Sequence, residues 1–278
     1  MAGRLVICAT PIGNLGDVSS RMREALASAD LVYAEDTRRT RSLLEHLGLA
    51  PKVRSYFAGN ERRRSAELAA DLEAGRVVVL VTDAGMPSVS DPGVSAVRVA
   101  VDTGADVSVV PGPSAVTAAL AGSGLPAERF VFEGFLPRKG RARADRLDRL
   151  AAEDRTIVLF AATARVAEDL VDLAGALGHD RLVVVARELT KLHEELWRGT
   201  LGAAAGRWSH EVEARGEFTI VVAGATSAPP APDDLVGDVI AAEAHGLTRS
   251  DAVRQVAAAA GVSRRELYQA VIRGRGGA

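Results

Sequence analysis

Cysteine is nearly absent from this chain. Cys8 is the only cysteine among 278 residues and lies in an apolar run. It has no partner in the chain, which excludes intrachain disulfide bonds and fits a reducing compartment.

Long apolar runs and an excess of positive charge are absent too. No run approaches the roughly 20 apolar residues of a membrane helix, and no signal peptide is expected before the first strand. The formal net charge is -2, so any contact with nucleic acid has to come from local basic patches. We therefore expect a soluble, cytoplasmic protein.

The common phosphate-binding patterns are also lacking. Neither G-x-G-x-x-G nor G-x-x-x-x-G-K-[ST] follows any expected strand. NAD and ATP are therefore disfavoured as ligands.

The chain does contain β-branched runs that end in loops rich in Gly and Pro. The clearest run, 77–81, predicts a strand buried on both faces of a parallel sheet, and a loop over 82–93 follows it. Open α/β sheets bind ligands beyond the carboxyl ends of their strands. Gly85 and Gly93 allow close approach of the backbone, and the loop is longer than most βα turns. A binding loop is therefore favoured over an ordinary turn.

Two further expected strands end in loops of the same kind. The strand over 4–9 leads into 10–17, and the strand over 106–110 leads into 111–114. Strand–helix alternation up to about Leu125 predicts a parallel, doubly wound α/β domain with these loops on one rim.

A short strand over 31–34 ends differently, in two carboxylates beside two arginines. These residues, Glu35, Asp36, Arg38 and Arg39, indicate either a polar site or simply the acidic start of a helix.

The pattern changes around 122–128, where we place a domain boundary. Strands are expected over 130–135, 156–160 and 182–186. Later strands over 194–199 and 217–223 could pair with each other in a mixed sheet. The expected fold class is therefore α/β, with an N-terminal domain, a C-terminal α/β domain and a small helical tail over 1–124, 125–226 and 233–278.

The tail follows a proline-rich linker over 225–232. Its helix, glycine-containing turn and second helix over 247–272 resemble a helix-turn-helix. A small packing module is the more common use of such a unit.

A basic segment follows the strand over 130–135 and continues into an expected helix. It contains Arg138, Lys139, Arg141, Arg143, Arg146 and Arg149, whose charge Asp145 and Asp148 offset only in part. The segment is either a contact for a polyanion or a solvated helix face.

Six motifs in this order resemble the ribosomal RNA small subunit methyltransferase I group, cytidine 2′-O-methyltransferases of the tetrapyrrole methylase superfamily. They are Thr10–Leu15, Ala34–Arg38, Asp83–Gly85 with Ser90–Gly93, Pro111–Pro113, Glu133–Pro137 and Ala186–Lys191. The resemblance covers about Arg4 to Gly224, and the C-terminal helices look like the tail of that group.

The resemblance implies two α/β domains with S-adenosylmethionine in the cleft between them, and a homodimer. The acceptor it implies is a ribose 2′-hydroxyl of small-subunit (16S) ribosomal RNA. By position in the motifs, the residues expected to bind the cofactor are Pro11, Asp83, Ala84, Gly85, Ser88, Val89, Ser114, Ala115, Phe160, Ala161, Glu188, Leu189, Thr219 and Ile220. The residues expected to bind RNA are Arg138, Lys139, Arg141 and Lys191.

Two positions depart from the pattern of that group. Met86 stands where a threonine is usual, and the segment 55–59 before Asn60 lacks the histidine common there. That histidine cannot serve as a base in this chain.

Methyl transfer from a sulfonium is an in-line displacement that needs positioning and the handling of one proton, but no metal. Asp36, Asp17 and Glu35 are candidates for the proton, and Arg38, Lys139 and Lys191 for the alkoxide or a phosphate. We expect Asp36 and Arg38 to be catalytic. The competing interpretation is that Asp36 only orders its neighbouring arginines.

Two other functions compete with this one. A tetrapyrrole C-methyltransferase would share the fold and the cofactor, but would not need the basic segment over 138–149. A non-enzymatic regulator that binds nucleic acid through its C-terminal helices would leave the strand-end loops unexplained.

Overall fold

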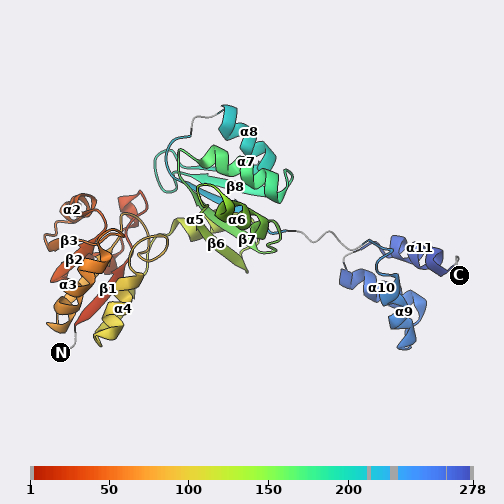
Figure 1. Ribbon diagram of the computed structural model, residues 1–278, viewed down its shortest axis with the longest axis horizontal. Coiled ribbons are helices and arrows are strands. Elements are labelled where there is room, and N and C mark those ends of the chain that lie inside the picture. The colour runs from red at the N-terminus through yellow and green to blue at the C-terminus, as the bar shows by residue number, and fades with distance from the viewer. Residues whose placement is uncertain (1–2, 212–213, 226–230, 261, 276–278) are drawn as a thin grey trace. The chain divides into compact units, whose positions relative to one another are not determined.

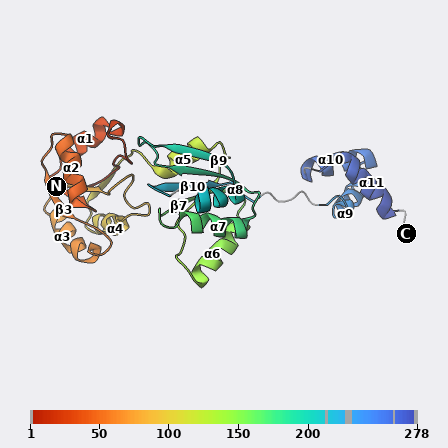
Figure 2. The ribbon, with the colours of Figure 1, turned by 90° about the horizontal axis from the view of Figure 1, so that it is seen from above.

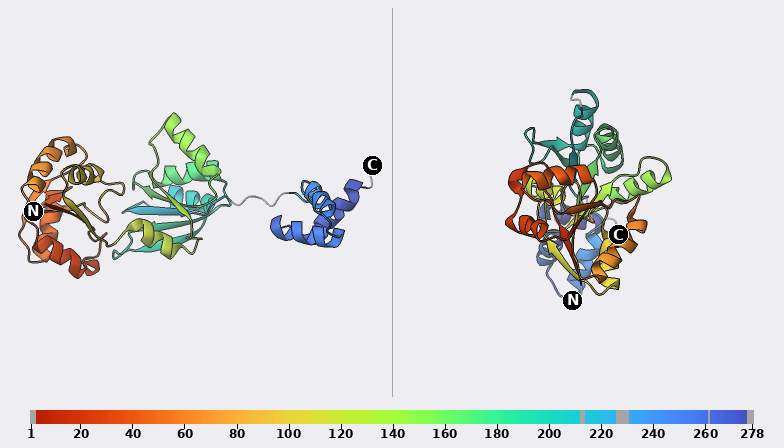
Figure 3. Two further views of the ribbon diagram at one scale, coloured as in Figure 1. Left: turned by 90° about the horizontal axis from the view of Figure 1, so that it is seen from below. Right: turned by 90° about the vertical axis from the view of Figure 1, so that its left-hand side faces the viewer.

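The computed structural model describes residues 3–211, 214–225, 231–260 and 262–275. The chain divides into two compact units, Met1–Gly224 and Ala225–Ala278, and each is described by itself. Figure 1 labels many of the elements of both, and Figures 2 and 3 show the same ribbon from other sides.

The first unit begins with a parallel sheet of five strands in the order β3-β2-β4-β1-β5. The strands are β1 (Arg4–Cys8), β2 (Leu31–Ala34), β3 (Lys52–Ser55), β4 (Val77–Val81) and β5 (Asp106–Val110). Because every pairing is parallel, all the carboxyl ends lie on one edge. The predicted doubly wound arrangement is confirmed.

Helices cover both faces of this sheet. On one face α3 (Glu61–Glu73) and α4 (Val94–Asp102) pack against Leu5 and Ile7, and on the other α1 (Ser20–Ala27) and α2 (Thr37–His46) pack against Val6 and Cys8. Alternate residues of β1 thus enter opposite cores, which is why its sequence is apolar throughout.

The second sheet is mixed, with the order β6-β7-β10-β8-β9. Its strands are β6 (Phe130–Phe135), β7 (Thr156–Ala161), β8 (Leu182–Arg187), β9 (Glu195–Thr200) and β10 (Phe218–Val222). Only β6 and β7 are parallel to each other. The suggested pairing of 194–199 with 217–223 is wrong, because β8 separates these two strands. All five residues of β10 are buried, which suits the centre of the sheet, whereas the half-buried β9 suits its edge.

The helices around the second sheet include α5 (Ala115–Ser123), α6 (Arg141–Ala151), α7 (Val166–Leu177) and α8 (Leu201–Gly206), with a π-helix over Arg207–Glu211. Helix α5 packs Val116 and Leu120 against β7, β8 and β10, although its residues precede the boundary placed near 124. The division into 1–124, 125–226 and 233–278 stays a prediction.

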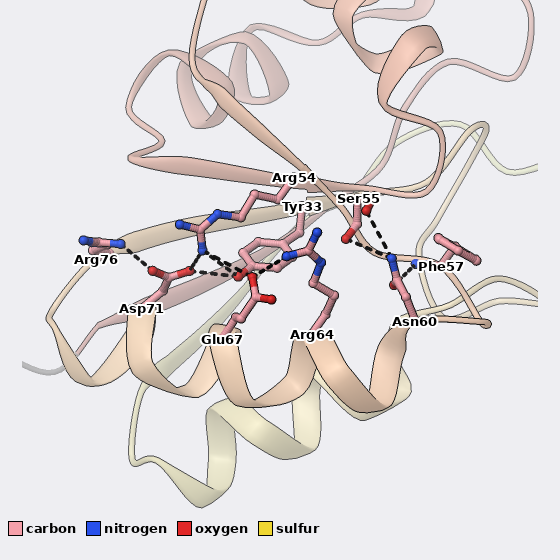
Figure 4. A network of polar contacts seen from close by, with 9 residues as sticks. All are labelled: Tyr33, Arg54, Ser55, Phe57, Asn60, Arg64, Glu67, Asp71 and Arg76. Atoms are coloured by element: carbon pink, nitrogen blue, oxygen red, sulfur yellow. Dashed lines mark hydrogen bonds and ion pairs between the residues drawn. The ribbon is translucent and has the colours of Figure 1, made fainter.

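A polar network fixes α3 to the first sheet (Figure 4). The buried carboxylate of Asp71 accepts hydrogen bonds from the Tyr33 hydroxyl at 2.8 Å and from Arg54 at 2.6 Å, and Arg76 binds its other oxygen. A buried charge is tolerated only when it is paired in this way. The network therefore holds α3 against β2 and β3.

The second unit consists of α9 (Val236–Ala244), α10 (Arg249–Ala260) and α11 (Arg264–Arg275). They share a core of their own that includes Val239, Val253 and Leu267. Among the described residues of either unit, no helix combines the length and the apolar character needed to cross a membrane.

Candidate functional site

Three strand-end loops meet at the carboxyl edge of the first sheet. Thr10 and Gly85 form an antiparallel bridge, with N–O distances of 2.9 and 3.1 Å, and the Thr10 hydroxyl donates to the Thr82 carbonyl at 3.1 Å. Gly85 has a φ of +79°, and a Cβ on it would lie 3.6 Å from the Pro113 carbonyl oxygen of the third loop. The loops expected on one rim are therefore in contact.

A cavity of about 390 Å³ lies between these loops and the second sheet. Such a volume falls in the range of small-molecule sites. Eight of the expected cofactor residues line it: Ala84, Gly85, Val89, Ser114, Ala115, Phe160, Ala161 and Thr219. Its walls are mainly apolar, and Phe135 lies 5.6 Å, centroid to centroid, from Phe160.

A second cavity of about 300 Å³ adjoins the first. The two cavities share Ile12, Ala84 and Glu217. Pro11 and Asp83, also expected at the cofactor, line this second cavity together with Arg39 and Lys191. The second cavity is thus the more polar of the two.

Four expected cofactor residues line neither cavity: Ser88, Glu188, Leu189 and Ile220. Ile220 is buried in the core of the second sheet, because it points to the opposite face from its neighbour Thr219. Leu189 packs against the other face of that sheet. Whether any of the four contacts a cofactor stays a prediction.

Ser88 and Glu188 instead shape the loops behind the cavities. Both have positive φ, 72° and 50°. The Ser88 hydroxyl is buried beside Gly93, where a Cβ would approach it to 2.5 Å, and it has no hydrogen-bond partner among the residues that the structure describes. The Glu188 carboxylate accepts from the Glu217 N–H at 2.8 Å.

Asp36 caps α2 rather than pointing into a cavity. Its carboxylate accepts from the Arg38 N–H at 2.8 Å and pairs with the Arg38 guanidinium at 3.0 Å. These hydrogen bonds lower the pKa of Asp36 to about 2. The Asp36 N–H donates to Asp83 at 3.0 Å, which links this turn to the second cavity.

Asp91 lines the first cavity and has a different environment. Burial, and then the charge of Glu35, raises the pKa of Asp91 to about 6. Burial and the charge of Asp83 likewise raise the pKa of Glu35. Sequence reasoning missed Asp91 as a titrating group, and the only signal for it is its place as the second carboxylate of the loop over 82–93.

Lys191 bridges two acidic residues at the mouth of the second cavity. Its ammonium group lies 2.8 Å from a Glu188 oxygen and 3.0 Å from a Glu217 oxygen. Its alkyl chain crosses Gly13, where a Cβ would lie 2.5 Å from Lys191 Cγ. Close packing at Gly13 therefore requires glycine.

The basic segment divides into exposed and buried residues. Arg138, Lys139 and Arg141 are exposed, and Arg141 faces Asp145 at 3.5 Å. Arg143 is buried and contacts Asp169 at 2.8 Å and Asp172 at 2.6 Å. The expectation that Arg143 belongs to a polyanion contact is wrong, because two carboxylates of α7 already bind it.

Of the two departures from the family pattern, only Met86 lies at the site. Met86 lines the first cavity and packs against the core of the first sheet. Asn60 accepts from the Phe57 N–H at 2.9 Å and donates to the Ser55 hydroxyl at 3.1 Å. No cluster of three or more His, Cys, Asp or Glu suited to a metal occurs among the residues that the structure describes.

Comparison with known proteins points to the methyltransferases. The model of the tetrapyrrole (corrin/porphyrin) methylases matches residues 4–205. The chain is 46% identical to ribosomal RNA small subunit methyltransferase I of Synechocystis over 96% of each chain. It is also 46% identical to the protein of that name from Mycobacterium bovis, over 99% of this chain and 96% of the other.

A solved structure shares the fold. A uroporphyrin-III C-methyl transferase from Thermus thermophilus, complexed with S-adenyl homocysteine, superposes with a TM-score of 0.55 at 21% identity, covering 80% of this chain and 97% of the other. The two-sheet architecture of the first unit is therefore one already known.

Proposed function

The chain belongs to the tetrapyrrole methylase family and, within it, to the ribosomal RNA small subunit methyltransferase I proteins, and on this premise we propose that it methylates small-subunit ribosomal RNA with S-adenosylmethionine. The acceptor in this proposal is the 2′-hydroxyl of a cytidine ribose. The names of the relatives favour this function over a tetrapyrrole C-methyltransferase.

The observation that carries the proposal is the pair of adjoining cavities. Group transfer needs a donor and an acceptor side by side, and the two cavities meet at Ile12, Ala84 and Glu217. One is mainly apolar and the other polar, so they suit two different molecules. A regulator that only bound nucleic acid would not need two adjoining cavities.

The residues of the first cavity fit S-adenosylmethionine, which would supply a methyl group on a positively charged sulfur. Phe135 and Phe160 offer aromatic surface to an adenine ring. Gly85 keeps the wall free of a side chain, and Asp91 offers negative charge toward a cation. No phosphate-binding loop is needed for this donor.

The residues of the second cavity suit an RNA acceptor. Arg39 and Lys191 carry positive charge there, and Arg39 lies 3.6 Å from Asp83. Such cations can hold a phosphate or stabilise the oxygen that attacks the methyl group.

The roles of Asp36 and Arg38 stay a proposal. Because Arg38 holds the pKa of Asp36 near 2, this carboxylate is a weak base, and the geometry favours the alternative in which Asp36 orders Arg38. Asp91, with a pKa of about 6, is better matched to accepting a proton near neutral pH, although its side chain lines the donor cavity and not the acceptor cavity. Arg38, 88% exposed, is free to contact RNA through the rest of its guanidinium.

Further parts of the proposal follow from the family. We expect a homodimer, and a ribosomal substrate would locate the activity in the cytoplasm. Arg138, Lys139 and Arg141 remain proposed RNA contacts, as does Lys191. Sedimentation analysis of the purified chain tests the dimer.

The decisive experiment is methylation of small ribosomal subunits with labelled S-adenosylmethionine, followed by mapping of the methyl group. Label on a cytidine ribose is the expected result, and label on a base or no transfer would refute the proposal. Calorimetry on Gly85→Val checks the donor site. The valine side chain would enter the cavity from a backbone position with a φ of +79°. We therefore expect S-adenosylmethionine to bind at least about tenfold more weakly to this variant.

A further inference from the structure

We propose that the loop after β3 and the first turn of α3 form a platform for a single-stranded segment of the RNA. In this platform Phe57 stacks on a base, and Arg62 and Arg63 contact phosphates. The proposal rests on the function proposed above and adds a binding surface outside both cavities. Phe57, Gly59, Asn60, Arg62 and Arg63 line a shallow hollow there.

Phe57 is an exposed aromatic side chain on the loop between β3 and α3 (Figure 4). Its exposed fraction is 44%, whereas the neighbouring Tyr56 is fully buried and contacts Tyr33 edge to face at 5.8 Å. The Asn60 side chain binds the Phe57 N–H, and the Asn60 N–H donates to the Phe57 carbonyl at 2.8 Å. Buried Tyr56 and capping Asn60 thus fix the backbone on both sides of Phe57.

Gly59 supports the ring from below. A Cβ on Gly59 would lie 2.7 Å from Phe57 Cε2 and 3.3 Å from Cδ2, so the ring packs directly on the glycine backbone. One edge of the ring is therefore held, while part of its surface faces solvent. An ordered, exposed ring loses little entropy when a base stacks on it.

Arg62 and Arg63 occupy an unfavourable position for cations. They lie in the first turn of α3, where the helix dipole favours negative charge. Arg64 next to them pairs with Glu67, and the Glu61 carboxylate accepts from the Gly93 N–H at 3.1 Å. Within the described part of the chain, Arg62 and Arg63 are exposed and have no ion pair of their own. Local stability does not explain two such arginines, but a polyanionic ligand does.

The platform lies on the same edge of the sheet as the two cavities. Strand β3 neighbours β2, and β2 neighbours β4, so the platform is two strand spacings, roughly 10 Å, from the loop of Asp83. The turn that carries Arg38 and Arg39 lies between them. A strand of RNA that crosses from the platform to the acceptor cavity would therefore pass the turn of Arg38 and Arg39.

The chemistry of the platform selects single-stranded RNA. Proteins recognise unpaired nucleotides by stacking bases on aromatic rings and by neutralising phosphates with arginine. A paired duplex would offer the phosphates but no free base for Phe57. We therefore expect the contacted nucleotides to be unpaired and to flank the acceptor.

The first test compares two double variants with matched loss of charge. Arg62→Gln/Arg63→Gln removes the platform arginines, and Arg4→Gln/Lys52→Gln removes two exposed cations at the opposite, amino edge of the same sheet. Binding to purified small ribosomal subunits is measured over a range of salt. We expect the first variant to bind about tenfold more weakly. We also expect the salt slope, which is the slope of log K for binding against the logarithm of the salt concentration, to become shallower by about 1.4, since each phosphate contact on a single strand contributes about 0.7. The control should match the wild type.

The second test separates stacking from charge. Phe57→Ala should weaken subunit binding about 5- to 150-fold with an unchanged salt slope, and Phe57→Trp should restore binding. Calorimetry with S-adenosylmethionine should give wild-type affinity for every variant, because none of these residues lines the donor cavity.

The outcomes distinguish this inference from the proposed function. If the platform variants bind subunits like the control while the wild type methylates them, the platform is refuted and the function stands. Weaker binding without a change of salt slope in the arginine variant would indicate contact with ribosomal protein and would also refute it. Because binding is measured separately from methylation, a wild type that transferred no methyl group would refute only the function.

Discussion

The environments of Asp36 and Asp91 differ enough to assign them different roles. Hydrogen bonds from Arg38 lower the pKa of Asp36 to about 2, whereas burial raises that of Asp91 to about 6. A general base works best when its pKa lies near the working pH. We therefore predict that Asp36→Asn keeps most of its single-turnover methylation rate and that Asp91→Asn loses about 10²-fold or more.

The comparison is made at saturating S-adenosylmethionine, with binding of donor and of subunits measured in parallel. Asn keeps the shape of Asp at both positions and removes only the charge. A large loss of methylation rate in Asp36→Asn with intact binding would show that Asp36 accepts the proton. Equal rates in both variants would exclude Asp36 and Asp91 alike as the group that takes the proton in the rate-limiting step.

Asp91 also makes folding stability depend on pH. Because its folded pKa is raised to about 6, the folded state binds more protons than the unfolded state between about pH 4 and 6. Its contribution to stability is therefore full below pH 4 and is lost as the pH rises through 6. Asp91→Asn should gain stability relative to wild type on going from pH 4 to pH 7, measured by urea unfolding at both values. If the difference in stability between the variant and the wild type does not change with pH, burial does not raise the pKa of Asp91.

Single residues show what could be predicted from the sequence. The turn chemistry around Gly85 predicts a loop that lines a cavity, because glycine at positive φ and a strand end are both local properties. The burial of Ile220 follows from which face of β10 meets α7 and α8, and that depends on tertiary packing. The raised pKa of Asp91 likewise depends first on its burial in the folded chain and then on Glu35, which lies 56 positions away in the chain.

The basic segment over 138–149 contains a buried arginine as well as exposed cations. Arg143 is buried against Asp169 and Asp172, and removal of one partner from a buried ion pair costs roughly 3–5 kcal/mol. We predict that Arg143→Ala destabilises the first unit by about this amount in urea unfolding. The triple variant Arg138→Gln/Lys139→Gln/Arg141→Gln should unfold like the wild type, because these side chains are exposed.

The same triple variant tests the proposed RNA contacts. Its salt slope for subunit binding should fall, by up to about 0.7 for each phosphate that the variant no longer neutralises. Coincident slopes for variant and wild type would mean that the turn before α6 and the first residue of α6 are only a solvated face. Arg141 is expected to contribute least, since Asp145 already lies 3.5 Å from it.

Elements were easier to predict from the sequence than their partners. The apolar runs of β1, β4, β7, β8 and β10 mark them as strands without any further information. Periodicity cannot tell that β10 inserts between β7 and β8, because the strand order depends on contacts distant in sequence. Helix α5 shows the same limit: its apolar face is visible in the sequence, but the sheet that it covers is not.

The first unit contains both cavities and the platform, each built by residues up to Thr219. The first cavity takes its walls from both sheets, so neither sheet alone would form a donor site. This explains why the six motifs are spread over nearly two hundred positions, from Thr10 to Lys191. Motif order could be read from the sequence, whereas the junction of the two cavities at Glu217 could not.

The last prediction concerns the independence of the two units. Helices α9, α10 and α11 have their own core, and the last strand of the first unit is complete at Val222, with the Ala223 N–H donating to the Leu182 carbonyl at 2.9 Å. A chain cut after Ala225 should therefore fold and bind S-adenosylmethionine within about twofold of the wild type by calorimetry. If the shortened chain folds but has a weaker affinity for the donor, the second unit contributes to the donor site. If it keeps donor affinity and no longer binds subunits, α9 to α11 contact the ribosomal substrate, which exposed Arg265 and Tyr268 at the start of α11 are suited to do.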